Sequence, residues 1–220
     1  IDPNEVIAPA EAAWEDLEQV HTPEYMQDVA QGSLSAAALR RLGFPWSLAL
    51  VRRSRLSVNG TYQAAQIALA DGRGANLAGG THHGFADRGE GFCLFNDVAV
   101  AIRCLQRDGR IRRALVVDLD VHQGNGTAAI FAQDAEVFTF SMHGARNYPF
   151  QKVQSDLDVE LADGTGDEAY LQALSLHLPH VLEAARPEIV FYLAGVDVIA
   201  RDRFGRLALT RAGLHARERY

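Results

Sequence analysis

Short apolar runs that end abruptly in polar residues are the dominant pattern of this chain. Those at 114–117, 137–140 and 189–193 have the length of a strand and are followed by polar segments. The uninterrupted run at 114–117 is typical of a strand buried on both faces of a sheet, and we expect strands at 137–140 and 189–193 as well. The short segment Ala-Asn-Leu-Ala at 75–78 leads into a Gly-rich polar segment, and we expect a strand there too.

Helical periodicity fills the intervals between these runs. Apolar residues recur at helical spacing over 61–71 and again after Asn96, whose side chain is expected to cap the second helix. Thr22 is the predicted N-cap of an earlier helix. A capping box formed by Thr165 and Glu168 is expected to begin a helix before the last strand.

Strands that alternate with helices predict an α/β fold, with a mostly parallel central sheet and helices on both faces. Such folds place their sites outside the carboxyl ends of the strands. The sequence has no internal repeat, low-complexity tract or long linker, so we expect a single domain over 1–220.

The amino-acid composition argues against several classes of protein. The chain has 220 residues, of which 48% are hydrophobic, so it can bury a substantial core. Its net charge of −7 argues against direct binding to nucleic acid. No apolar stretch approaches the ~18 residues of a membrane span. With only Cys93 and Cys104, a reducing compartment is expected, cytoplasmic or, in a eukaryote, also nuclear.

The segment Asp118-x-Asp120-x-His122 follows the strand at 114–117, and alternation along a strand starts its three side chains on one side. Two carboxylates in such a place call for a neutralising cation, although a solvated Asp-rich turn is the simpler alternative. Asp197 lies at another strand exit. The residues Asp120, His122 and Asp197 could supply three ligands and leave one position open, as in catalytic zinc sites.

His82 and His83 follow a Gly-Gly pair, and we expect them at the same sheet edge. Asp118 would orient one imidazole and Asn125 the other. A carboxylate partner stabilises the charged form, whereas an amide leaves its imidazole free to exchange a proton. The alternative is a pair of ordinary loop histidines.

Other reactive side chains are less informative. His143 is interpreted either as a residue near the site or as a loop histidine. Cys93 lacks the base and orienting group of a thiol nucleophile, so we expect a buried small residue. Four histidines have no identifiable partner and receive no function: His21, His177, His180 and His215.

Four segments, at 79–83, 89–93, 118–126 and 194–197, resemble in order and spacing the motifs of the zinc-dependent histone deacetylase family. Asn125, where class I members have Asp, makes the chain most similar to class IV deacetylases and their bacterial relatives. The resemblance implies a three-layer arginase/deacetylase fold. It also implies hydrolysis of an acetyl or longer acyl group from an N-acylated amine, typically a lysine of a protein.

The resemblance further implies site roles. Zinc would be held by Asp120, His122 and Asp197. It would polarise the acyl carbonyl and activate its bound water. His83 would take the proton of that water and return it to the leaving amine, with Asn125 orienting it. His82, paired with Asp118, would assist electrostatically.

Substrate contacts and a second ion are implied in the same way. Phe92 would form one wall of a narrow channel for the acyl-lysine stem, with Tyr148 as the facing wall. The carbonyl of Gly91 would lie near the substrate amide. A structural potassium ion would bind near Asp118 and Ser141.

The chain departs from the family pattern at its ends. The family's first strand and helix are missing, as is its later Gly-Gly-Tyr tyrosine, which stabilises the oxyanion; Tyr220 is no credible substitute. We therefore expect a fragment of a longer protein. An acyl-lysine-binding pseudoenzyme, an acetylpolyamine amidohydrolase and, less favoured, a two-metal ureohydrolase remain alternatives. Acyl length, amine carrier and oligomeric state stay open.

Overall fold

The computed structural model describes residues 6–220, and the chain divides into two compact units that meet in sequence at Ile111 and Arg112. The first unit carries the His82–His83 pair, and the second carries the Asp118–His122 segment. Whether the two units act as the single catalytic domain expected over 1–220 stays a prediction.

The second unit is built on a four-stranded parallel sheet of order β3-β2-β1-β4. Its strands are β1 (Ala114–Asp118), β2 (Val137–Gly144), β3 (Leu157–Leu161) and β4 (Ile189–Leu193). The α/β class and three of the predicted strands are thereby confirmed. The strand β3 was not anticipated because its Leu-Asp-Val-Glu-Leu sequence alternates apolar and acidic residues, as suits a half-solvated edge strand.

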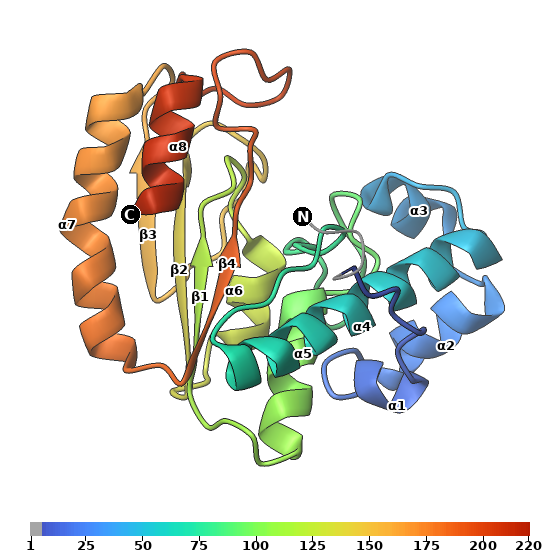
Figure 1. Cartoon of the computed structure of the whole chain (residues 1–220). Helices are drawn as coiled ribbons and strands as arrows, with labels where there is room; N and C mark the ends of the chain where they lie inside the picture. The colour runs from blue at the N-terminus through green and yellow to red at the C-terminus, as the bar shows by residue number, and fades with distance from the viewer. Residues whose placement is uncertain (1–5) are drawn as a thin grey trace. The chain divides into compact units, whose positions relative to one another are not determined.

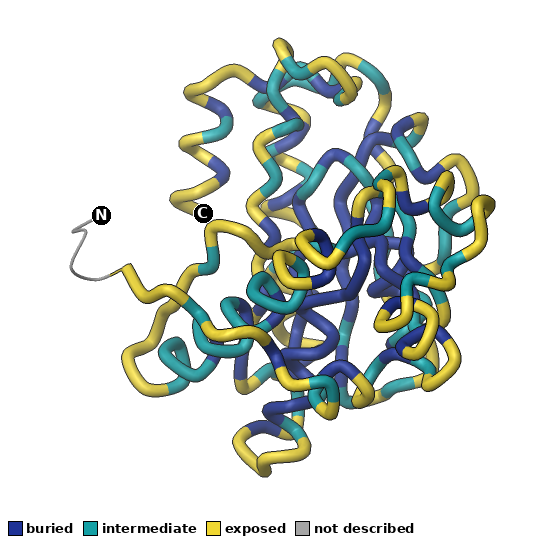
Figure 2. Tube along the Cα trace, turned by 90° about the vertical axis from the view of Figure 1, so that its right-hand side faces the viewer, coloured by how far each residue is buried: buried dark blue, intermediate teal, exposed yellow. Residues whose placement is uncertain are grey.

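Helices lie on both sides of this sheet. In Figure 1, α7 (Asp167–Ala185) and α8 (Arg211–Arg219) lie on one side, and α6 (Asn125–Phe131) lies on the other. Figure 2 shows the chain of the central strands in the dark blue of buried residues, whereas α7 and α8 alternate between buried and exposed turns. The core between sheet and helices includes Leu115, Val117, Phe140, Met142, Tyr170 and Leu174.

The predicted capping box of α7 is wrong. Gly166 is the N-cap and makes no side-chain bond, and the Thr165 hydroxyl donates to the carbonyl of Ala162 instead. The carboxylate of Asp167 accepts hydrogen bonds from the amide and hydroxyl of Thr210, at 2.8 and 2.6 Å. This pair joins the start of α7 to the N-cap of α8.

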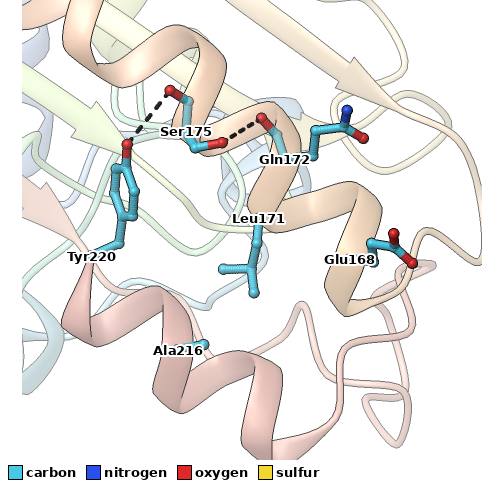
Figure 3. A pocket seen from close by; sticks show the side chains of 6 residues that line it. All are labelled: Glu168, Leu171, Gln172, Ser175, Ala216 and Tyr220. Carbon is cyan, nitrogen blue, oxygen red and sulfur yellow. Dashed lines mark hydrogen bonds between the residues drawn. The ribbon is translucent and has the colours of Figure 1, made fainter.

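Helices α7 and α8 border a shallow open groove (Figure 3), lined by Glu168, Leu171, Gln172, Ser175, Ala216 and Tyr220. The hydroxyl of Tyr220 reaches across it toward the carbonyl of Ser175, at a long 3.5 Å. No titratable cluster or buried polar group is part of this lining.

The first unit is helical in its described part. It contains α1 (Trp14–Leu17), α2 (Pro23–Gln31), α3 (Ala36–Leu42), α4 (Leu48–Asp71) and α5 (Asp97–Arg107). The predicted caps Thr22 and Asn96 are confirmed, each accepting a backbone N–H. The helix expected over 61–71 is the second half of α4. Across residues 6–220, no helix is both long and apolar enough to span a membrane.

The strand expected at 75–78 is not formed. The segment is an exposed turn, and Leu77 is 82% exposed. Its geometry comes from Asn76, whose amide donates to the carbonyl of Ser57 and the hydroxyl of Thr61 on α4, at 2.9 and 2.8 Å. The same side chain accepts the amide of Ala78. Hydrogen bonds from the Asn76 side chain to α4 therefore hold this segment, in place of pairing with a neighbouring strand.

Candidate active site

Two strand exits of the second unit bring the predicted metal ligands together. The strands β1 and β4 are parallel neighbours, with Asp118 opposite Leu193 at their carboxyl ends. The chain leaves β1 through residues 119–124 and leaves β4 through residues 194–197. Asp197 is thereby placed beside the loop that carries Asp120 and His122.

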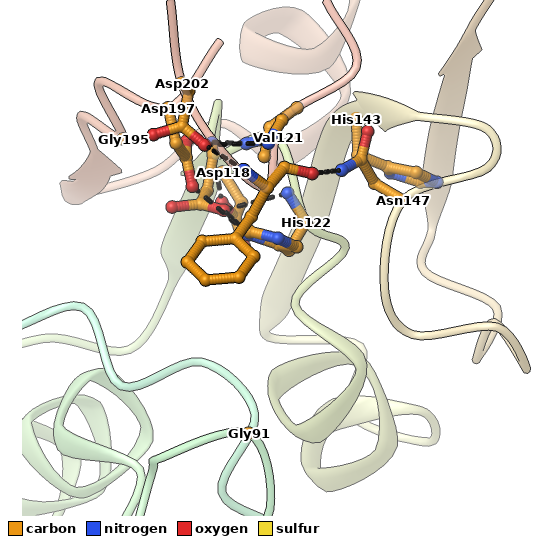
Figure 4. Close-up of polar contacts among 12 residues, drawn as sticks. Gly91, Asp118, Val121, His122, His143, Asn147, Gly195, Asp197 and Asp202 are labelled. Atoms are coloured by element: carbon orange, nitrogen blue, oxygen red, sulfur yellow. Dashed lines mark hydrogen bonds and ion pairs between the residues drawn. The ribbon is translucent and has the colours of Figure 1, made fainter. Parts of the chain in front are cut away.

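The three predicted ligands form a tight cluster. Donor atoms of Asp120, His122 and Asp197 all lie within 4.8 Å of one another, and all three residues are half-buried. The Nδ1 atom of His122 lies 2.9 Å from a carboxylate oxygen of Asp120 and 3.2 Å from one of Asp197. Figure 4 shows the labelled side chains of His122 and Asp197 close together at the ends of the two strands.

Backbone hydrogen bonds hold the carboxylates in place. The amide of His122 donates to Asp120 at 2.8 Å, and the amide of Val121 donates to Asp197 at 3.1 Å. Asp118, buried at the end of β1, accepts the amide of Asp120 at 3.1 Å. Each acidic side chain of the cluster is therefore oriented by the neighbouring backbone.

Gly195 makes the close approach of the two loops possible. A Cβ atom at this position would lie 2.5 Å from Oδ2 of Asp120 and 2.6 Å from its Cα atom. Because these distances are shorter than any normal carbon contact, a larger residue would push the loops apart. The glycine of the 194–197 motif is thus required by packing against a metal-ligand candidate.

The electrostatics of the cluster favour a cation. Burial lowers the pKa of His122, but hydrogen bonds to Asp120 and Asp197, together with their negative charges, outweigh burial and raise that pKa to about 10. A proton on the imidazole is the response expected where two carboxylates converge. A divalent cation neutralises them in the same way, and one nitrogen and two oxygen donors fit a three-ligand zinc site.

The His82–His83 pair lies in the first unit, on the segment between α4 and α5. Both residues are buried, and their ring centroids are 4.1 Å apart. The preceding Gly80 has a φ of +85°, which a glycine adopts without strain. The amide of His82 donates to the carbonyl of Gly80 at 3.0 Å, so a tight turn precedes the pair.

Asp97 anchors the segment just before this pair. Its carboxylate, on the first residue of α5, is fully buried. It accepts the amide and hydroxyl of Thr81 at 2.7 and 2.6 Å and the amide of Gly80 at 3.0 Å. Thr61 of α4 donates to it as well, at 2.5 Å. The role of Asp97 cannot be recognised in the sequence because its partners are 16 or more positions away.

Asn96 and His21 hold the segment just after the pair. The Asn96 amide donates to the carbonyl of Gly84 at 3.0 Å. His21 accepts the Asn96 backbone amide on Nε2 at 3.2 Å, so its proton lies on Nδ1, which donates to the carbonyl of Phe85 at 3.0 Å. Burial lowers the pKa of His21 to about 4, although backbone hydrogen bonds oppose the shift. His21, which the sequence left without a role, is a neutral structural connector.

The predicted substrate-binding residues of the first unit border His83. A Cβ atom on Gly91 would lie 2.6 Å from Cδ2 of His83, so the glycine backbone packs against that imidazole. Phe92 is 61% exposed and has a φ of +67°. Its amide donates to the carbonyl of Leu42 at 2.8 Å, and its ring lies 5.1 Å from that of Phe44. The last residue of α3 therefore holds the backbone of Phe92, and Phe44, just after α3, packs against its exposed ring.

Tyr148 belongs to the second unit and borders the carboxylate cluster. Its ring centroid lies 6.4 Å from that of His122, with the two rings edge to face at 64°. Tyr148 therefore lies next to the candidate ligands. Its assignment as the wall facing Phe92 stays a prediction.

Further predicted residues lie in the core of the second unit. Asp118 pairs in register with Ser141 of β2, and both are buried. His143 is no loop histidine, because it lies fully buried within β2, with Nδ1 2.9 Å from the hydroxyl of Ser141. Asn125 is the buried first residue of α6. The potassium ion at Asp118 and Ser141 and the orienting role of Asn125 stay predictions.

Comparison with known proteins agrees with this architecture. The family model of the histone deacetylase domain matches residues 1–220. An uncharacterized protein of Picosynechococcus sp. is 50% identical over the whole chain, which covers 73% of that protein. Histone deacetylase 2 of Arabidopsis thaliana is 33% identical over 97% of the chain and 57% of its own length.

Solved structures give the same result. The histone deacetylase homologue of Aquifex aeolicus superposes with a TM-score of 0.87 at 28% identity. A homologue complexed with SAHA superposes with a TM-score of 0.86, also at 28% identity. Each is matched over 100% of the present chain and 64% of its own length. The family model that matches residues 1–220, together with the shared fold, shows that the chain belongs to the histone deacetylase domain family.

Proposed function

We propose that this chain forms part of a zinc-dependent deacetylase that removes an acetyl or longer acyl group from an acyl-lysine of a protein. The observation that carries the proposal is the cluster of Asp120, His122 and Asp197, whose donor atoms lie within 4.8 Å of one another. Membership in a deacetylase family supports the reaction class. Zinc bound there would act as a Lewis acid on the acyl carbonyl and on the attacking water.

The histidine pair supplies the proton transfers in this proposal. His83 accepts a proton from the attacking water and returns it to the leaving amine, with Asn125 orienting its imidazole. His82, paired with Asp118, stays charged and contributes electrostatic stabilisation. The buried setting of both imidazoles and the anchors on each side of them support a fixed, preorganised pair.

The substrate site completes the proposal. Phe92 and Tyr148 flank the acyl-lysine stem, and the carbonyl of Gly91 accepts a hydrogen bond from the substrate amide. Asp118 and Ser141, buried opposite each other on β1 and β2, would hold a structural potassium ion. Both cysteines are buried and neither forms a disulfide, which supports a cytoplasmic or nuclear location.

The experiment measures amine release by the purified whole protein from acetyl-lysine peptides, long-chain acyl-lysine peptides and acetylpolyamines, before and after zinc removal by a chelator. We expect peptide turnover that the chelator abolishes and zinc restores. SAHA, which is present in one solved homologue, is expected to inhibit it. Turnover of acetylpolyamine alone would overturn the proposed substrate.

The matched variants are His83→Ala and His180→Ala, the latter removing an exposed histidine of α7. Loss of a general base costs about 10²–10⁴-fold in rate, so the first variant should be nearly inactive while retaining zinc. The second should match the parent. Peptide binding by a parent that releases no amine would overturn hydrolysis in favour of an acyl-lysine-binding protein.

A further inference from the structure

Arg217 of α8 is a charged residue that the proposed reaction does not use, and only 3% of it is exposed. Burying a guanidinium is costly unless its N–H groups are paired. Its Nε and Nη2 atoms donate to the carboxylate of Glu218, at 2.8 and 2.6 Å. The hydroxyl of Tyr192 donates to the same oxygen at 2.9 Å, so the carboxylate is itself held against the sheet.

The remaining nitrogen of Arg217 joins two segments of the chain. Its Nη1 atom donates to the carbonyl of Gly195 at 2.8 Å and to the carbonyl of Leu119 at 3.1 Å. Leu119 directly precedes Asp120, and Gly195 lies two residues before Asp197. A single nitrogen atom therefore bridges the two loops that carry the candidate metal ligands.

This bridge lies at the point where the sheet ends. The amide of Leu119 donates to the carbonyl of Leu193 at 3.2 Å, just past the last register pair of β1 and β4, Asp118 with Leu193. Beyond that bond, sheet pairing no longer fixes the separation between the segments that follow β1 and β4. For the next residues of each loop, this function falls to the guanidinium and to the hydrogen bond from the Val121 amide to the Asp197 carboxylate, at 3.1 Å.

The bridging group is charged. Burial lowers the pKa of Arg217, but the Tyr170 and Tyr192 hydroxyl groups and the Glu218 carboxylate outweigh burial and hold that pKa above its ordinary value. A charged, planar donor makes stronger and better-directed hydrogen bonds to carbonyl oxygens than a neutral side chain does.

We infer that Arg217 is a positioning residue of the zinc site, which fixes the separation between the loop of Asp120 and His122 and the loop of Asp197. The inference rests on the proposed zinc site and adds a residue about 20 positions beyond the last ligand in sequence. Residues that orient metal ligands from outside the coordination sphere typically change metal affinity by about 10- to 100-fold.

The test compares Arg217→Met, Arg217→Lys and Arg219→Met in the whole protein, with Arg219 as the exposed control on the same helix. Zinc affinity is measured by competition with a chromophoric chelator, and ligand geometry by the visible absorption of bound Co²⁺. Both are recorded at a temperature where circular dichroism shows each variant folded.

We expect zinc binding weakened by about 10- to 100-fold in Arg217→Met, with an altered Co²⁺ spectrum, and no change in Arg219→Met. Arg217→Lys should fall between Met and the parent, since an ammonium donates hydrogen bonds without the planar fork. If Arg217→Met does not fold, the Lys variant decides the test.

A folded Arg217→Met with the zinc affinity and Co²⁺ spectrum of the parent would overturn the inference. If Arg217→Met does not fold, the same result in Arg217→Lys would overturn it. Failure of the proposed function is distinguishable from this result. A parent protein that binds no zinc would overturn the zinc site itself, whereas a parent and a variant that bind zinc equally would overturn only the role of Arg217.

Discussion

The buried carboxylate of Asp97 accepts the amide of Thr81, the residue directly before His82, at 2.7 Å. Its neighbour Asn96 holds the carbonyl of Gly84, the residue directly after His83, at 3.0 Å. Two consecutive residues at the start of α5 thus fix the main chain on both sides of the histidine pair. Helix α5 is therefore the element that sets the position of the proposed proton-transfer groups.

Replacing Asp97 by Asn should reduce turnover without removing zinc. The amide group can accept fewer of the four donors, so one or more buried N–H or O–H groups would lose a partner, at a cost of about 1–3 kcal/mol each. Deacylation rate, urea unfolding and zinc content check the prediction. Asp71→Asn, on the exposed end of α4, is the control. Parent-like turnover in a folded Asp97→Asn would contradict it.

Replacing Gly195 by Ala should weaken the metal site directly. The new methyl group would collide with Asp120, because a Cβ atom would lie 2.6 Å from the Asp120 Cα atom. Overpacking of this kind typically costs about 1–3 kcal/mol of stability, and the displaced carboxylate should lower zinc affinity. Gly166→Ala, where the nearest atom is 3.9 Å away, is the matched control. Equal zinc affinity in both variants would show that the contact does not matter.

Acid should destabilise the first unit through His21. Its pKa is about 4 in the folded chain, against an ordinary 6.5, because burial disfavours the charged form. The unfolded chain therefore binds more protons between pH 6.5 and pH 4, and stability falls as the pH falls through that window. The full loss, reached below pH 4, is on the order of 3 kcal/mol.

The measurement for His21 is the free energy of unfolding in urea at several pH values. In His21→Gln the side chain does not titrate, so the decline between pH 6.5 and pH 4 should be smaller than in the parent. His180→Gln, which replaces an exposed histidine, should follow the parent curve. Identical slopes for parent and His21→Gln would refute the assignment.

Features that depend on local sequence could be predicted for this chain. Short, largely apolar runs predicted β1, β2 and β4, and Asp118-x-Asp120-x-His122 after β1 indicated a group of metal-binding donors. The strand β3 could not be recognised because a half-solvated edge needs no apolar run. The exposed segment at 75–78 was misinterpreted because its anchor, Asn76, acts through tertiary bonds to α4.

The supporting residues of the site could not be predicted, for a different physical reason. His21, Asp97 and Arg217 act through hydrogen bonds to main-chain groups 16 to 98 positions away. Every residue has a backbone carbonyl, and nearly every residue a backbone amide, so the sequence does not show which of them such a side chain will bind. Donors that bind metal, by contrast, must be His, Asp, Glu or Cys, and their spacing is visible in the sequence.

Elemental analysis of the purified whole protein is the decisive test of whether Asp120, His122 and Asp197 hold zinc. We expect about one zinc per chain in the parent and in Asp71→Asn, and strongly reduced zinc in Asp197→Asn, because a three-ligand site loses a charged donor. A parent without zinc, or an Asp197→Asn variant that retains the full amount, would refute zinc binding by these three residues.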